Sequence, residues 1–181
     1  IRVCHSIVDG CGLAIKTPVG TVVHTGDFKM DQTPVDGEVM DYARFSEYGE
    51  SGVLLFMSDS TNVEKEGYTL SEREIGYNLE EIFRKCSGRI IVAAFSSNIH
   101  RVQQVMDAAE KFGRKVVLNG RSMVANSRIA KALGYLKVSD DLLVDLRDLD
   151  SLAHDKVVLL TTGSQGEPMS ALTRMAMDNH K

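Results

Sequence analysis

The sequence predicts an α/β fold in which a largely parallel sheet is flanked by helices and preceded by a β-hairpin. Two observations support the parallel sheet. Short, uninterrupted apolar runs recur after Gly52, and segments with helical periodicity separate them, which is the pattern of strands covered on both faces. A third observation concerns the first 50 residues, where two β-like runs flank a Pro/Gly turn and indicate an antiparallel pair.

The elements follow in chain order. The hairpin joins residues 13–17 to residues 21–23 around Pro18 and Gly20. The first buried-looking strand is expected at 53–57. Ser71 and Glu74 then have the spacing of a capping box for a helix that stops at Gly88. The remaining elements repeat this alternation: strands at 90–95, 116–118 and 157–160, and helices from Ile99 to Gly113, from Ser122 to Gly134, and from Pro168.

Composition limits the classes of protein that fit. The 181 residues are 43% apolar and 25% charged, with a net charge of −4, which is the balance of a soluble globular protein without a general basic surface for nucleic acid. No apolar run reaches the ~20 residues of a membrane span. Three cysteines without CxxC spacing indicate a reducing compartment, the cytoplasm. Because the sequence opens on Ile1, we expect a piece of a longer protein.

Polar residues follow each predicted strand of the parallel sheet, at 58–62, 96–98, 119–122 and 161–167. Ligands of parallel sheets bind beyond the carboxyl ends of the strands, so we expect all four loops at one edge. The plain alternative is that these residues only cap helices and form turns. His100 and Arg101 stand in the first turn of a helix, where cations are unfavourable, and this favours an anion nearby, although Arg101 could also be simply solvated.

A second polar cluster lies around the hairpin. Thr25-Gly26-Asp27 could be an ordinary turn. Alternatively, Asp27 and His5 could bind a metal ion, since carboxylate and imidazole suit zinc or manganese. Catalytic zinc needs about three protein ligands and a water molecule. Asp9 and His24 could complete a set only under an assumed geometry.

Five stretches make a family resemblance specific. In order they are HSIVDGCGLAIKTPVGTVVHTGDFKMD at 5–31, SDSTN at 58–62, FSSNIHRVQQV at 95–105, LNGRSMVAN at 118–126 and TTGSQGEPMSAL at 161–172. Together they closely resemble the ribonuclease J family of metallo-β-lactamase/β-CASP nucleases, over nearly the whole chain. The resemblance implies that residues 1–48 are the incomplete C-terminal part of a metallo-β-lactamase αββα core, and that residues 49–181 are a β-CASP domain.

The resemblance also assigns roles. It makes His5 a metal ligand, Asp27 a catalytic carboxylate that bridges two zinc ions (manganese being possible), and Asp59 a catalytic residue that supports the metal centre by hydrogen bonding. RNA would be the partner, cut by metal-assisted hydrolysis in 5′-to-3′ exonucleolytic or endonucleolytic mode. The residues matching the family's RNA channel are Ser97, Asn98, His100, Arg101, Ser164 and Gln165.

Two family motifs are missing, the His-x-His-x-Asp-His segment and the C-terminal His-x-Ser-Gly-His segment. Both supply metal ligands, so we expect the metal centre to be incomplete or absent here and the isolated chain to be inactive. Val8, Gly10 and Cys11 also depart from the family's third motif, and Cys11 is either a small buried hydrophobe or a stray ligand.

Two alternatives to the nuclease remain open, and a third is disfavoured. The chain could be a non-catalytic RNA- or nucleotide-binding α/β module, or a small-molecule hydrolase of the metallo-β-lactamase type. A dinucleotide-binding domain is disfavoured because no Gly-x-Gly-x-x-Gly follows the first strand. Family analogy suggests a homo-oligomer.

Overall fold

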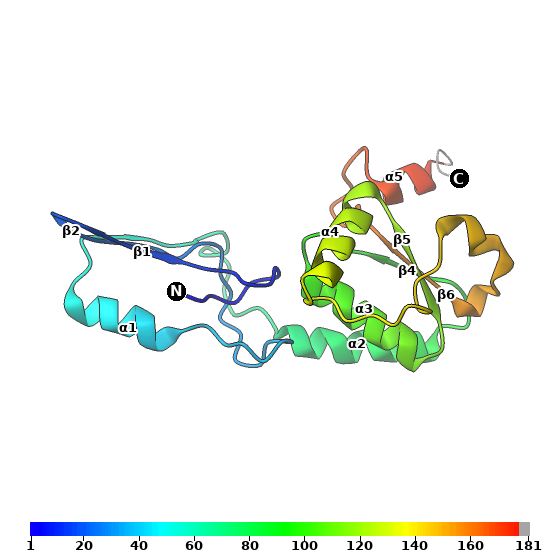
Figure 1. Cartoon of the computed structure of the whole chain (residues 1–181), viewed down its shortest axis with the longest axis horizontal. Helices are drawn as coiled ribbons and strands as arrows, with labels where there is room; N and C mark the ends of the chain where they lie inside the picture. Colours follow the sequence, from blue (N-terminus) through cyan, green and yellow to red (C-terminus); the bar gives the residue numbers. More distant parts are fainter. Residues whose placement is uncertain (178–181) are drawn as a thin grey trace. The chain divides into compact units, whose positions relative to one another are not determined.

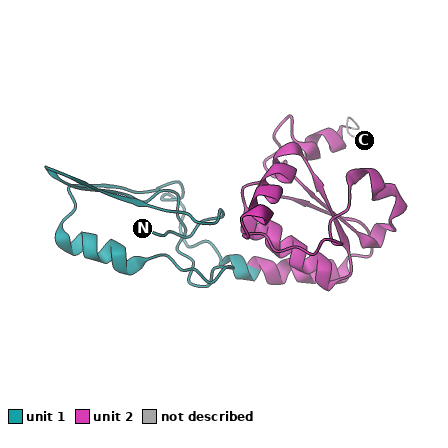
Figure 2. Ribbon diagram, in the orientation of Figure 1, with its two compact units in different colours: residues 1–74 teal, residues 75–181 magenta. Residues whose placement is uncertain are grey.

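The computed structural model describes residues 1–177, and the chain divides into two compact units, residues 1–74 and residues 75–181 (Figure 2). The α/β prediction is confirmed, since a small parallel sheet flanked by helices forms the core of unit 2. None of the helices within residues 1–177 has the length and apolar character needed to cross a membrane.

Unit 1 is built on a three-stranded sheet in the order β1-β2-β3 (Figure 1). The predicted hairpin is confirmed, because β1 (Leu13–Thr17) and β2 (Gly20–His24) pair antiparallel. The chain then forms α1 (Tyr42–Ser51) and returns as β3 (Leu55–Met57), which runs parallel to β2. A small apolar cluster of Val3, Cys4 and Met40 supports the segment before α1.

The strand predicted at 53–57 forms at 55–57, but the prediction of the sheet that it joins was wrong. We expected it to open the parallel sheet of the second half, but β3 belongs to the sheet of unit 1. Its apolar run suggested burial on both faces, yet Leu55, Phe56 and Met57 are 46–58% exposed. An uninterrupted apolar run indicates which residues favour a strand, but it does not say which sheet that strand joins.

Unit 2 contains the second sheet, in the order β4-β6-β5 (Figure 1). β6 pairs parallel with both neighbours. Helix α3 packs against β5 and β6, and α4 packs against β5. The bounds are α2 (Glu72–Lys85), β4 (Ile90–Ala93), α3 (Ile99–Lys111), β5 (Lys115–Asn119), α4 (Arg121–Ala132), the 3-10 helices η1 (Leu146–Ser151) and η2 (His154–Lys156), β6 (Val157–Thr161) and α5 (Ala171–Ala176).

The core of unit 2 lies between this sheet and its helices. Val116 and Val117 of β5 and Val158 and Leu160 of β6 are completely buried. The apolar face predicted for α3 is confirmed, because Val102, Val105 and Met106 are at most 1% exposed. This packing fixes the carboxyl ends of the three strands at one edge.

One helix was not predicted, and two expected helix starts differ from the structure. Helix α1 was not predicted, although the Asp41 side chain accepts a hydrogen bond from Arg44 N–H and caps it. Gly120 rather than Ser122 precedes α4, and no side chain caps that helix. Helix α5 is capped by Ser170, after the expected start at Pro168.

Asp31 connects the start of α2 to the body of unit 1. Its side chain is 4% exposed and accepts hydrogen bonds from Glu72 N–H and Thr33 N–H, both at 3.0 Å. Burial alone would raise the pKa of Asp31, but these two bonds, a bond with Ser71 and the nearby Lys29 ammonium outweigh burial and lower it. The ionised carboxylate therefore stabilises the folded chain.

We predict that Asp31→Asn destabilises the chain at pH 7 by about 1–3 kcal/mol, because an amide cannot accept both backbone N–H groups equally well. The folded-state pKa of Asp31 lies below its unfolded value, so its stabilisation is present above about pH 4 and is lost as the pH falls through the folded pKa. Urea unfolding of wild type and variant should therefore converge in acid. Glu64→Gln removes an exposed carboxylate of unit 1 and should show no such convergence. An unchanged difference between wild type and Asp31→Asn at low pH would contradict the prediction.

Candidate functional site

Three segments of unit 1 meet where β2 and β3 end. Thr25 N–H donates to the Met57 carbonyl at 2.9 Å, which extends the β2–β3 pairing by one residue. The Thr25 hydroxyl, in a residue only 1% exposed, accepts from Asp59 N–H at 2.9 Å and donates to the Gly26 carbonyl at 2.7 Å. This threonine therefore holds the start of the 58–62 loop beside the loop that carries Asp27.

Gly26 brings the Asp27 loop against the N-terminal segment. Its φ of +64° lies in the left-handed region, and a Cβ there would stand 2.7 Å from the Cys11 carbonyl oxygen. Gly12 makes the reciprocal approach, since its Cβ would stand 2.8 Å from the Thr25 carbonyl oxygen. Only glycine allows both backbones to come this close.

His5 lies on the N-terminal side of the same junction. Lys29 N–H donates to the Cys4 carbonyl at 2.7 Å, so the chain just after Asp27 runs beside the chain just before His5. Hydrogen bonds from Thr61 are the main cause of the lowered pKa of Asp59, and the charge of the His5 imidazole adds a smaller contribution. His5 is partly buried and Asp27 is exposed. The structure therefore brings the segments that carry His5, Asp27 and Asp59 side by side from three separate parts of the sequence.

Asp59 organises its surroundings by accepting hydrogen bonds. Oδ1 accepts from Thr61 N–H at 3.0 Å and from the Thr61 hydroxyl at 2.7 Å, and Oδ2 accepts from Phe28 N–H at 3.4 Å. These bonds, led by the two from Thr61, lower the pKa of Asp59. The bond to Phe28 restrains the peptide that follows Asp27, so Asp59 acts on the loop of the candidate ligand.

The other residues considered for the metal site have different positions. His24 Nδ1 accepts from Gly26 N–H at 2.9 Å, so His24 closes the turn before Asp27. Asp9 lies at the tip of the N-terminal loop with a φ of 55°. Cys11 is an exposed free thiol in a bridge opposite Arg2, which disagrees with a role as a buried hydrophobe.

The donor chemistry of His5 and Asp27 suits zinc or manganese, but two protein donors are fewer than the three of an ordinary catalytic zinc site. Within residues 1–177, no group of three or more His, Cys, Asp or Glu side chains could hold a metal ion. The residues present therefore fit part of a metal shell.

A second candidate surface is the carboxyl edge of the unit 2 sheet. Ala93 of β4 and Asn119 of β5 both register with Thr161 of β6, so the loops at 96–98, 119–122 and 161–167 begin at one level. Three of the four loops expected at this edge lie there. The expectation was wrong for the 58–62 loop, because this loop follows β3 in unit 1.

The predicted RNA-contact residues that follow β4 differ in their exposure and in their hydrogen-bond partners. The Asn98 side chain accepts from Arg101 N–H at 3.0 Å and caps α3, as the plain alternative proposed. His100 is 9% exposed, and Arg101 Nε donates to Gln104 Oε1 at 3.2 Å. Ser97 is exposed. Capping does not exclude ligand contact, so the RNA-contact role of these four residues stays a prediction.

Ser164 and Gln165 form the tip of the loop after β6. Both are exposed, and they lie between Gly163 with a φ of 117° and Gly166 with a φ of 72°. The backbone N–H of Gln165 donates to the Glu167 side chain at 3.3 Å, and the residue is exposed at the surface. The geometry of the loop is compatible with ligand contact, and that role also remains a prediction.

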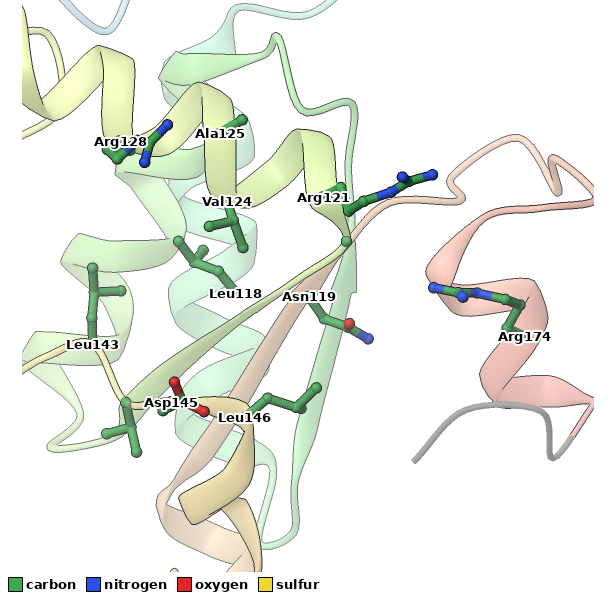
Figure 3. Close-up of a pocket in the computed structure, with 12 residues that line it drawn as sticks. Leu118, Asn119, Arg121, Val124, Ala125, Arg128, Leu143, Asp145, Leu146 and Arg174 are labelled. Carbon is green, nitrogen blue, oxygen red and sulfur yellow. The ribbon is translucent and has the colours of Figure 1, made fainter.

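Three arginines lie at this edge, of which the sequence analysis included Arg121 within the 119–122 loop and missed Arg128 and Arg174. Arg121, Arg128 and Arg174 line a cavity of about 700 Å³ beyond β5 (Figure 3). Arg121 and Arg128 are seven residues apart and therefore lie on one face of α4, a spacing that could have indicated a common surface. Arg174 comes from α5, and no local pattern connects it to the other two.

The fold of unit 2 places it among the α/β proteins whose ligand sites lie beyond the carboxyl edge of a parallel sheet. The family model described as "Ribonuclease J, beta-CASP domain" matches residues 87–181, and the chain belongs to this family.

Named relatives cover almost all of the chain. A protein named Ribonuclease J from Thermus thermophilus is 51% identical over 99% of this chain and 31% of its own length. Proteins of the same name from Mycobacterium tuberculosis and Helicobacter pylori are 49% and 46% identical, over 32% and 26% of their lengths. The chain thus spans about a third or less of these relatives.

One solved structure supports the fold alone. A protein of unknown function from Enterococcus faecalis V583 matches with a TM-score of 0.61 over 88% of this chain and 40% of its own, at 18% identity.

We predict that Gly26→Ala lowers the stability of the chain and displaces the Asp27 loop, because the new Cβ would meet the backbone of Cys11 at 2.7 Å. The expected loss is about 2–4 kcal/mol, the sum of left-handed strain and a steric overlap that the backbone must relieve. Urea unfolding and amide chemical shifts of residues 24–29 measure both effects.

Gly37→Ala is the matched control. Gly37 also has a left-handed φ, +79°, but nothing lies within 4 Å of the position that a Cβ would take there. It should lose only about 1 kcal/mol. Equal losses in the two variants would mean that the approach to Cys11 does not constrain the loop.

Proposed function

We propose that this chain is part of a metal-dependent ribonuclease of the ribonuclease J type, which hydrolyses RNA phosphodiesters by 5′-to-3′ exonucleolytic cleavage, endonucleolytic cleavage, or both. The observation that carries the proposal is the convergence of His5, Asp27 and Asp59 at the end of β2 and β3. The family membership of the chain and the names of its relatives support RNA as the substrate.

In this proposal His5 and Asp27 hold metal, zinc or manganese, two ions in the whole protein. When bound, such ions withdraw charge from a phosphodiester and lower the pKa of a coordinated water molecule. His5 donates through an imidazole nitrogen and Asp27 through its carboxylate. Asp59 keeps the Asp27 loop in place through its bond to Phe28 N–H.

RNA contact is proposed at the carboxyl edge of the unit 2 sheet. The exposed Ser97, Ser164 and Gln165 can donate hydrogen bonds to phosphate or sugar oxygens. Asn98, His100 and Arg101 build the start of α3, and the positive end of that helix dipole attracts anions. The acidic net charge of the chain, −4, means that such local sites must supply the attraction for RNA.

We further propose that the isolated 181-residue chain binds RNA without cleaving it, because His5 and Asp27 provide too few ligands for a catalytic metal. The three free cysteines favour a reducing compartment such as the cytoplasm. Assembly into a homo-oligomer is proposed from family analogy alone. Non-catalytic binding is thus the second candidate function, and the shortage of metal donors is the observation that favours it.

The proposal is tested with two proteins, this chain and a version extended at both ends with the flanking sequence of its parent. The extended protein should bind about two metal ions and cleave 5′-phosphorylated RNA. Asp27→Ala should abolish both properties. Asp59→Asn should lower metal affinity or activity by roughly 10–100-fold, the usual effect of removing a group that orients a ligand. Metal content by mass spectrometry and cleavage of labelled RNA are the measurements.

Glu50→Gln is the matched control, since it removes one exposed carboxylate from α1 without touching the junction, and it should leave metal content and cleavage unchanged. An extended protein that hydrolyses a β-lactam or another small ester but not RNA would favour the small-molecule hydrolase. RNA cleavage by the short chain alone would show that His5 and Asp27 are not the limiting ligands.

A further inference from the structure

A cavity of about 700 Å³ lies beyond the carboxyl end of β5 in unit 2 (Figure 3). Its volume falls in the range of roughly 300–1,000 Å³ that is typical of small-molecule sites. The walls come from the end of β5, one face of α4, the segment 143–146 and Arg174 of α5. None of the side chains proposed individually for catalysis or RNA contact lines it, although the 119–122 loop contributes to its wall.

The polar side of the cavity is cationic. Arg121, Arg128 and Arg174 line it, and within residues 1–177 none of them forms an ion pair or a side-chain hydrogen bond. Figure 3 shows the Arg174 side chain pointing across the opening toward Arg121 and Asn119. Guanidinium groups that face one another without carboxylate partners repel, so an anion between them would be stabilised.

The single carboxylate in the wall does not cancel this charge. Asp145 accepts hydrogen bonds from Arg147 Nε at 2.9 Å and from a second guanidinium nitrogen of Arg147 at 3.2 Å. Arg147 itself lies outside the cavity lining. The Asp145 charge is therefore largely neutralised by its own partner, and three arginines face the cavity.

The opposite side of the cavity is apolar. Leu118, Val124, Leu143 and Leu146 line it. A second cavity of about 470 Å³ adjoins the first and shares Gly120, Arg121 and Arg174 with it. Thr162 and Ser122 add hydroxyl groups there. Arg121 and Arg174 thus line both cavities, so a phosphate held between them could be joined to a base that lies against the apolar wall of the first.

We propose that this cavity binds a nucleoside phosphate, with the phosphate between Arg121 and Arg174 and the base against the apolar wall. The α4 N-terminus at Gly120 has no side-chain cap, so its N–H groups add to the attraction for the phosphate. The ligand is either a free nucleotide or one nucleotide of a bound RNA strand. Only the RNA source rests on the proposed function.

The test measures binding of AMP, adenosine and inorganic phosphate to the 181-residue chain by calorimetry. AMP should bind more tightly than either of its parts, because it alone fills both sides of the site. Arg121→Ala and Arg174→Ala should each weaken AMP binding by about 10-fold, the loss of a charged hydrogen bond, and Arg174→Lys should lose less than Arg174→Ala. Arg44→Ala removes an exposed arginine from α1 and should bind AMP like wild type.

Circular dichroism confirms that each variant is folded before its affinity is compared. Folded variants that bind AMP like wild type, or a wild-type chain that binds AMP no better than phosphate, would overturn the proposal. Displacement of AMP by 5′-phosphorylated RNA would identify the RNA strand as the source, and AMP binding without displacement would identify a free nucleotide.

The two proposals can fail separately. An extended protein that cleaves RNA while Arg121 and Arg174 prove irrelevant to AMP binding would retain the ribonuclease and reject the nucleotide site. AMP binding that depends on both arginines, in a protein that cleaves no RNA, would retain the nucleotide site and reject the ribonuclease.

Discussion

The close approach of Gly26 to the Cys11 carbonyl is the constraint on which the arrangement of unit 1 depends. Any side chain at position 26 would stand 2.7 Å from that oxygen. With glycine there, the chain can turn beside the N-terminal segment, and Lys29 N–H then donates a hydrogen bond to the Cys4 carbonyl. The hydrogen bonds of Thr25 and Asp59 then add the third segment. A backbone contact between residues 11 and 26 thereby positions side chains from residues 5, 27 and 59.

Much of the architecture could be predicted because periodicity reports burial. The helical spacing of Val102, Val105 and Met106 identified α3, and the Pro/Gly turn identified the β1–β2 hairpin. The placement of β3 could not be predicted in the same way. Its apolar residues look like those of β4 and β6, and only the hydrogen bonds to β2 decide which sheet it joins. Helix α1 has no fully buried residue, and its one periodic signal, the partly buried Tyr42, Phe45 and Tyr48, was not used in the sequence analysis.

The candidate sites show the same limit. His5, Asp27 and Asp59 stand in the stretches that carry the family resemblance, so the sequence was enough to propose them as candidates. Their mutual position depends on long-range backbone contacts that no local pattern encodes. Arg128 and Arg174 of the cavity were missed for a related reason. Arg121 and Arg128 share a helix face, but Arg174 joins them only through the fold. Conversely, Asn98 was proposed for RNA contact, and its side chain is engaged in capping α3.

The strand order β4-β6-β5 has a consequence for how unit 2 is made. The strand at the centre of this sheet is the last of the three in the sequence, and the two outer strands do not pair with each other. During synthesis, β4 and β5 emerge from the ribosome before the strand that joins them exists. The sheet must therefore close late, through contacts between residues far apart in the chain, which is a slow kind of folding event. Until Val157–Thr161 is available, the apolar residues of β4 and β5 have no sheet to complete, and the nascent chain is open to chaperones and to aggregation.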